Sequence, residues 1–154
     1  MMYRVIAIIS CFILIISCKN SEEKNEEIKI GQYNVATNQG KEQSELEMSI
    51  SRGKGIYSDF CMQCHLPNGK GIPGNFPPLA GSNWLTEKRQ ATIHAVKYGQ
   101  NGEIQVNGVT YNNVMAPMGL SEKEVADVLN YAMNSWGNTQ EKMVTVDEVK
   151  SVSK

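Results

Sequence analysis

Two cysteines and a histidine stand together in the stretch FCMQCHLPNGKG at residues 60–71, and this motif limits what the chain can fold into. Two residues separate Cys61 from Cys64, and His65 follows the second cysteine directly. Structural zinc sites usually take four protein ligands, and the remaining cysteines, Cys11 and Cys18, stand in an N-terminal apolar segment. A redox Cys-x-x-Cys pair usually follows a strand in a β-α-β pattern, which the sequence does not show.

The spacing of the motif instead predicts covalent attachment of one c-type haem. The two intervening residues, Met62 and Gln63, bring both sulfurs to one side of a porphyrin, within reach of neighbouring vinyl groups. His65 then lies beneath the iron and supplies an axial nitrogen. A redox Cys-x-x-Cys beside an incidental histidine is the alternative.

The chain has 154 residues, enough for one domain, and apolar periodicity predicts three helices in it. The first covers residues 46–61 and leads into the cysteine motif. The second covers residues 85–99, with Thr86 as its N-cap and Gly99 as its C-cap.

The third and strongest helical pattern lies in residues 119–138. Ser121 and Glu124 form a capping box at its start, and Gly137 closes it. One apolar face consists of Val125, Val128, Leu129, Ala132 and Trp136.

The segments between the helices are unusually long for a small domain. Residues 66–83 are dense in glycine and proline and predict a loop. Residues 103–111 predict a small hairpin that turns at Asn107-Gly108. A loop of about twenty residues inside a compact domain normally argues against the secondary structure assigned around it. Such a loop is reasonable, however, where it wraps around a large apolar ligand.

The N-terminus predicts export. Arg4 precedes an apolar run at residues 5–16, which is shorter than the about 20 residues of a membrane-spanning helix and typical of a signal peptide. The run ends in Ile15-Ile16-Ser17-Cys18, which resembles the lipobox of bacterial lipoproteins. That resemblance implies a signal peptide over residues 1–17 and a lipid on Cys18. A signal peptide cut elsewhere and an uncleaved short anchor are the alternatives, and all three export the chain.

Three further segments follow the signal peptide. Residues 18–45 are rich in charge without a helical stripe and predict a lipidated cysteine followed by a flexible polar tether. The folded domain covers residues 46–137. Residues 138–154 predict a polar tail, whose valines can form a short strand or helix against the domain.

The segment at residues 48–137 resembles the mono-haem class I c-type cytochromes. In that family a glycine stands eight residues before the first haem cysteine and an aromatic residue four before it, positions that Gly53 and Tyr57 hold here. Tyr131 matches the aromatic residue of the other helix, where a glycine lets two backbones cross beside a ring. The resemblance implies an all-α small cytochrome c fold, with three to four helices around one covalently bound haem and a short hairpin-like loop before the axial methionine.

The family also places a proline-containing turn after the cysteine motif, which Phe-Pro-Pro-Leu-Ala-Gly at residues 76–81 matches. This match implies that the Pro77 carbonyl accepts a hydrogen bond from the ring N–H of His65. It also implies that Leu79 lies against the porphyrin.

The sixth iron ligand in the family is a methionine before the last helix, where this chain has both Met115 and Met118. Pro117 stiffens the segment that follows Met115, which favours Met115 and leaves Met118 as the alternative. A bis-histidine site would use His94, but the polar residues Gln90 and Lys97 on its helix face favour an ordinary surface or partly buried histidine.

A methionine in the sixth position leaves the iron no vacancy for a substrate, and the residues named assemble no acid–base pair or nucleophile. The resemblance therefore implies a non-enzymatic electron carrier in a respiratory or dehydrogenase- or reductase-linked chain. Its partners would be an oxidase, reductase or dehydrogenase, and it would be lipid-anchored on the periplasmic side of a bacterial membrane. The formal net charge of −1 gives no reason to expect nucleic acid. The alternative is a haem enzyme or gas sensor with a displaceable distal methionine.

Overall fold

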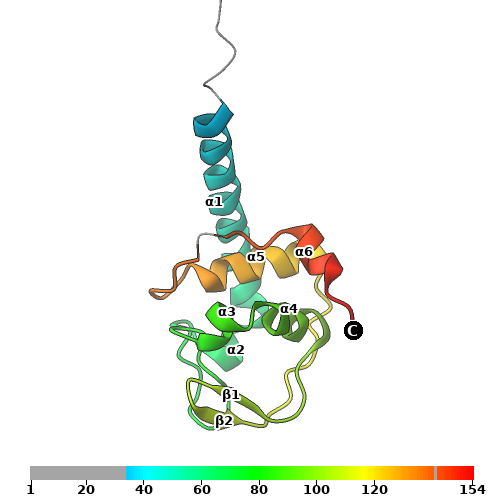
Figure 1. Ribbon diagram of the computed structural model, residues 1–154. Coiled ribbons are helices and arrows are strands. Elements are labelled where there is room, and N and C mark those ends of the chain that lie inside the picture. Colours follow the sequence, from blue (N-terminus) through cyan, green and yellow to red (C-terminus); the bar gives the residue numbers. More distant parts are fainter. Residues whose placement is uncertain (1–33, 141) are drawn as a thin grey trace, which may run out of the picture. The chain divides into compact units, whose positions relative to one another are not determined.

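The computed structural model describes residues 34–140 and 142–154 of the chain (Figure 1). The expected signal peptide at residues 1–17, the lipidation site Cys18 and the first part of the tether lie outside the described residues. None of the helices in the described ranges has both the length and the apolar character needed to cross a membrane.

The described chain is mostly helical, with one small antiparallel sheet. Its elements are α1 (Asn34–Phe60), α2 (Met62–His65), α3 (Asn83–Glu87), α4 (Arg89–Tyr98), β1 (Ile104–Val106), β2 (Val109–Tyr111), α5 (Glu122–Met133) and α6 (Val146–Ser151). The two strands pair from Ile104 with Tyr111 to Val106 with Val109, which confirms the hairpin at Asn107-Gly108. The architecture agrees with the small cytochrome c fold.

Helix α1 crosses α5 at Gly53 (Figure 1). A Cβ atom at Gly53 would lie 2.0 Å from the backbone oxygen of Asp127, so only glycine allows the two backbones this close. Beside the crossing, the rings of Tyr57 and Tyr131 pack with centroids 5.4 Å apart. The expected glycine and aromatic contacts of the crossing are both present.

Helix α5 begins as predicted but ends earlier. The side chains of Ser121 and Glu124 form the capping box at its start. The helix ends at Met133 rather than near Gly137, and the chain turns three residues later at Trp136, which has a positive φ of 54°. The Trp136 ring thereby reaches Tyr57 at a centroid distance of 4.9 Å, so this residue packs on the helix crossing instead of continuing the helical face.

The predicted second helix is in fact two helices. Ser82 caps α3 by accepting a hydrogen bond from the backbone N–H of Trp84, and the chain leaves helical geometry at Lys88 before α4 begins. The assignment of Thr86 as N-cap is therefore wrong, since Thr86 lies inside α3. Gly99 does end α4, with a φ of 88°.

The boundaries of the tether and the tail also require correction. Residues 34–45, expected in the flexible tether, belong to α1. The expected polar tail carries α6, and Val144 and Val149 are fully buried in the core. Arg89 fixes this segment through two hydrogen bonds of 2.6 and 2.8 Å to the Glu148 carboxylate. The tail packs against the domain because its buried valines complete an apolar cluster to which α4 and α5 also contribute.

A buried polar network joins α1, α5 and the C-terminal segment. Asp127 accepts hydrogen bonds from Ser49 (2.7 Å), Arg52 (2.7 Å) and Lys123 (2.6 Å). Asn130 donates to Ser49 and to the Val144 carbonyl, both at 2.9 Å. Burial alone would raise the pKa of Asp127, but the hydrogen bonds from Arg52, Lys123 and Ser49 outweigh it and lower the pKa to about 2.

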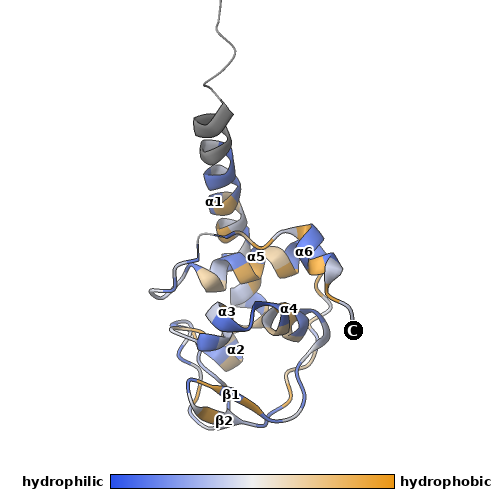
Figure 2. Ribbon diagram, in the orientation of Figure 1, coloured by the Kyte–Doolittle hydropathy of each residue, from blue (hydrophilic) through white to orange (hydrophobic). Residues whose placement is uncertain are grey.

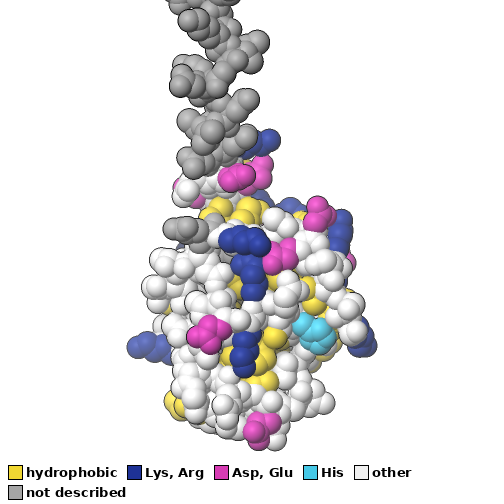
Figure 3. All heavy atoms as spheres, viewed as in Figure 1, with side chains coloured by type: hydrophobic (Ala, Val, Ile, Leu, Met, Phe, Trp, Pro, Cys, Tyr) yellow, Lys and Arg dark blue, Asp and Glu magenta, His cyan; other side chains and the backbone are white. Residues whose placement is uncertain are grey.

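The apolar residues gather on the inner side of these elements. Figure 2 shows both hydrophobic and hydrophilic stretches in α5 and in the two strands. In the view of Figure 3, acidic and basic side chains are scattered among uncharged ones, without a patch of one sign.

Candidate functional site

A cavity of about 350 Å³ lies between α5 and the long loops. Its wall comes from the cysteine motif, the proline loop, α3, α4, the hairpin, the methionine loop and α5. The lining is largely apolar and contains no lysine, arginine, aspartate or glutamate. A volume of this size is within the range of small-molecule and cofactor sites.

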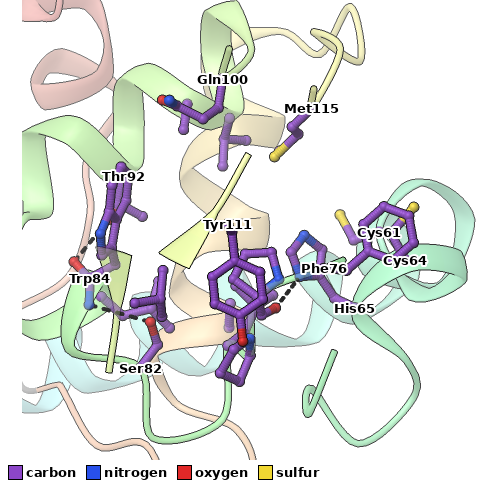
Figure 4. A pocket seen from close by; sticks show the side chains of 18 of the residues that line it. Cys61, Cys64, His65, Phe76, Ser82, Trp84, Thr92, Gln100, Tyr111 and Met115 are labelled. Carbon is purple, nitrogen blue, oxygen red and sulfur yellow. Dashed lines mark hydrogen bonds between the residues drawn. The ribbon is translucent and has the colours of Figure 1, made fainter. Parts of the chain in front are cut away.

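The histidine of the motif points into this cavity (Figure 4). His65 is buried, and its Nδ1 lies 2.9 Å from the carbonyl oxygen of Pro77. Burial lowers the pKa of His65, although the Pro77 hydrogen bond opposes that shift, so the ring is neutral at pH 7. With Nδ1–H donated to Pro77, Nε2 keeps a free lone pair for a metal ion.

The single turn of α2 places both thiols on the same wall as the imidazole. The backbone N–H groups of Cys64 and His65 both donate to the Cys61 carbonyl, at 3.2 and 2.9 Å. Both cysteines are free and half-buried, and both line the cavity. Burial, reinforced by the nearby Cys64, raises the pKa of Cys61 to about 11. Redox Cys-x-x-Cys pairs have a lowered thiol pKa, so this environment is unlike theirs.

The proline loop folds back on itself to bring Pro77 to His65. Gly71 has a φ of 61°, and a Cβ atom there would lie 2.3 Å from the Phe76 oxygen and 2.5 Å from the Pro77 oxygen. The backbone N–H of Leu79 donates to the Gly69 carbonyl at 2.7 Å, and Leu79 lines the cavity. Sequence reasoning missed Gly71, although the repeated glycines of NGKG mark the turn.

Met115 and Met118 both line the cavity. Figure 4 shows the Met115 side chain entering the cavity and facing His65 across it. The backbone of Met115 pairs with that of Gln100 through two hydrogen bonds of 2.8 Å. Neither Gln100 nor Gly99 was predicted to contribute to the site, because only the folded chain brings the end of α4 beside the methionine loop.

His94 is not among the residues that line the cavity. It is half-buried on α4, where its ring packs against Tyr98 at a centroid distance of 5.2 Å. The expectation of an ordinary, partly buried histidine therefore agrees with its place in the structure.

The hairpin and α3 contribute cavity residues that the sequence reasoning did not assign. Ile104, Val106 and Tyr111 line the cavity, and the Trp84 Nε1–H donates to the Gln105 carbonyl at 2.7 Å. The alternation of apolar and polar residues in EIQVNGVTY could have indicated these residues. Alternating side chains point to opposite faces of a strand, so the apolar face of such a hairpin must be buried against something.

The donor set fits haem better than a bare metal ion. The described residues contain no group of three or more His, Cys, Asp or Glu side chains that could hold a metal. An imidazole nitrogen and a thioether sulfur on opposite sides of an apolar cavity suit an iron that is already held by a macrocycle. Two neighbouring free thiols, Cys61 and Cys64, stand in the wall of the same cavity.

Comparison with known proteins identifies the family. Residues 50–136 match the cytochrome c family. The chain is 39% identical over 116 residues to a cytochrome c-552 of Thermus thermophilus, which covers 70% of this chain and 78% of that protein. A second Thermus thermophilus cytochrome c-552 is 40% identical over 109 residues, covering 65% of this chain and 82% of that protein.

A more distant relative belongs to a larger protein. The cytochrome c subunit of a quinone alcohol dehydrogenase of Gluconacetobacter polyoxogenes is 32% identical over 101 residues, which covers 63% of this chain but only 21% of that subunit. The match over residues 50–136, together with the cavity and its donor set, leads to one conclusion. The chain belongs to the cytochrome c family and is an electron carrier with one covalently bound haem c.

Proposed function

We propose that Cys61 and Cys64 attach the haem, that His65 and Met115 are its axial ligands, and that the protein only passes electrons and catalyses no reaction of its own. The observation that carries this proposal is the cavity itself. His65 and Met115 face each other across it, both thiols stand in its wall, and no charged side chain lines it (Figure 4).

Each of these residues has a separate role in holding the haem for electron transfer. When bound, haem c supplies an iron that gains and loses one electron. Each thiol would hold the haem by adding its S–H across a vinyl group to form a thioether. Pro77 fixes the orientation of His65 through the 2.9 Å hydrogen bond and makes Nε2 more electron-rich. The apolar lining, with Leu79 and the hairpin, excludes water.

A sixth ligand that stays bound favours a carrier over an enzyme or gas sensor. A methionine–histidine pair also raises the reduction potential relative to two histidines. The test is a pair of leucine variants in the oxidised holoprotein. Met115→Leu should abolish the long-wavelength iron–sulfur absorption band and lower the reduction potential, whereas Met118→Leu should keep the band. The reverse result would assign the sixth position to Met118, and a wild-type protein without the band would favour an enzyme or sensor.

The N-terminal sequence supports export and a lipid anchor on Cys18, which would place the domain on the periplasmic side of a bacterial membrane. Several acyl chains hold a protein firmly, at about 0.8 kcal/mol for each buried CH₂ group. Labelled fatty acid should appear on the wild-type protein. Cys18→Ala should release the protein or stall its processing, and a wild-type protein found soluble and cut elsewhere would contradict the proposal.

A dehydrogenase, reductase or oxidase is the proposed redox partner. One relative is, by name, the cytochrome c subunit of a quinone alcohol dehydrogenase, which supports a partner of this class. Redox partners usually meet through small, short-lived interfaces, below about 1,200 Å². Reduction of the holoprotein by membranes supplied with a dehydrogenase substrate, followed by reoxidation by an oxidase, would test this role.

A further inference from the structure

We propose that Gly99 and Gln100, at the carboxyl end of α4, are positioning residues that keep Met115 in the sixth position. This inference rests on the ligand assignment proposed above and adds what holds the sulfur there. Much of the loop that carries Met115 is exposed, and the neighbouring Val114 is 67% exposed. Exposed loops open at low free-energy cost, so this loop needs a support to hold a thioether in one place.

The first contact of the support is a backbone pair. The Gln100 N–H donates to the Met115 carbonyl, and the Met115 N–H donates to the Gln100 carbonyl, both at 2.8 Å. The pair is an isolated antiparallel bridge outside the hairpin. Within the described ranges, Met118 takes part in no such backbone pair, so the support is specific to Met115.

The second contact is the close approach of Gly99. Its φ of 88° is in the left-handed region, and a Cβ atom there would lie 2.7 Å from the Met115 carbonyl oxygen. The same Cβ would lie 3.0 Å from Cδ of Pro117, so it would push on the loop at two points. Only glycine therefore lets the end of α4 lie this close to the loop.

The end of α4 is itself held firmly. Lys97 Nζ donates to the carbonyls of Val149 and Val152 at 3.0 and 3.1 Å, and the Tyr98 hydroxyl donates to the Val152 carbonyl at 3.2 Å. Ile93, one turn earlier, is fully buried. These contacts bind α4 to the core and to a C-terminal segment beyond the residues matched to the family, so the loop rests on a rigid platform.

A matched pair of glycine variants tests the proposal. Gly102 has a φ of 89°, nearly the same as Gly99, but no atom lies within 4 Å of a Cβ placed there. Gly99→Ala and Gly102→Ala therefore both place a side chain at a positive φ, and only Gly99→Ala pushes on Met115. The measurement is the apparent Kd of the oxidised holoprotein for added imidazole, which competes with Met115, together with the iron–sulfur band.

Gly99→Ala should lower the apparent Kd for imidazole by about tenfold or more and weaken the band, because the competing thioether is held less tightly. Gly102→Ala should stay within about twofold of the wild type. Equal effects of the two variants would overturn the inference while leaving the ligand assignment intact. A wild-type protein that lacks the band would overturn the assignment itself.

A second measurement needs no variant. Amide hydrogen exchange in the wild-type holoprotein should show the Gln100 and Met115 amides protected, and saturating imidazole should expose both together while β1 and β2 stay protected. If imidazole displaces the sulfur while the pair remains protected, then the pair does not position Met115.

Discussion

Where α1 crosses α5, the protein's own side chains fill the interior, whereas another face of α5 borders a cavity of about 350 Å³. The crossing side has helices, a buried ion-paired network and stacked aromatic rings. The cavity side is built largely from loops and a two-stranded hairpin. A hairpin of two strands is only marginally stable by itself, and the loops lack the regular hydrogen bonds of a helix or a sheet. The difference indicates that the first side is stabilised by the chain and the second by the haem.

The largest expected effect comes from removing the covalent attachment. The double variant Cys61→Ser, Cys64→Ser should lose most of its haem and be largely unfolded. Without the haem, the largely apolar lining of the cavity is left exposed to water, and a domain this small has few other apolar contacts to stabilise that side. Pyridine haemochrome absorbance and circular dichroism would measure both losses. A well-folded, haem-free variant would show that the cavity side does not need the haem.

The next effect concerns the crossing. Gly53→Ala puts a Cβ atom 2.0 Å from the Asp127 oxygen, so the helices must separate, and we expect a loss of about 3 kcal/mol in the free energy of unfolding. Gly55→Ala is the matched control on the same helix, because no atom lies within 4 Å of its Cβ. The control should gain about 0.5–1 kcal/mol from helix propensity. Urea unfolding of the two holoproteins would measure this, and equal stabilities would contradict the close crossing.

A smaller effect is expected at the buried carboxylate. Asp127→Asn should cost about 1–2 kcal/mol at pH 7, toward the lower end because Arg52 and Lys123 are about half exposed and solvent screens their charges. The pKa of Asp127 is lowered to about 2 in the folded protein, below its unfolded value, so its contribution is present above the unfolded pKa. Stability of the wild type should therefore fall more steeply than that of the variant as the pH drops from about 5 to about 2. Acid titrations that fall with the same slope in both proteins would rule out this role for Asp127.

The smallest effect is expected at a link between two loops on the cavity side. The Asn113 side chain donates to the Asn75 carbonyl at 3.0 Å, and both residues are exposed. Asn113→Ala should cost less than about 1 kcal/mol and leave the iron–sulfur band unchanged, because the haem and the Gln100 pair already hold these loops. Urea unfolding and the absorption spectrum of the holoprotein would measure both, and a large loss of stability would show that the loops support each other directly.

Much of the site was evident in the sequence because its chemistry depends on short spacing. Cys61, Cys64 and His65 lie within one helical turn, so their placement on one wall needed little from the rest of the fold. Ser121 and Glu124 defined the start of α5 for the same reason. The close approach at Gly53 could be predicted because the family pattern records a crossing that any side chain would block.

Several elements were misjudged where distant residues decide the outcome. The tail was expected to be polar with valines that form a strand or a helix, and only its distant partners, Arg89 and the apolar side chains of α4 and α5, decide that it packs as α6. The predicted helix end at Gly137 failed because α5 stops at Met133 and the chain then turns, so that Trp136 packs on Tyr57. Neither partner is visible in the local pattern.

The sequence by itself determined the Cys-x-x-Cys-His motif, the class of fold and the two methionines proposed for the sixth position, because local spacing and turn chemistry specify these. The tertiary structure alone decided how Met115 is supported. Its partners Gly99 and Gln100 are separated from it by the whole hairpin, and backbone hydrogen bonds carry no side-chain signature that a sequence could show.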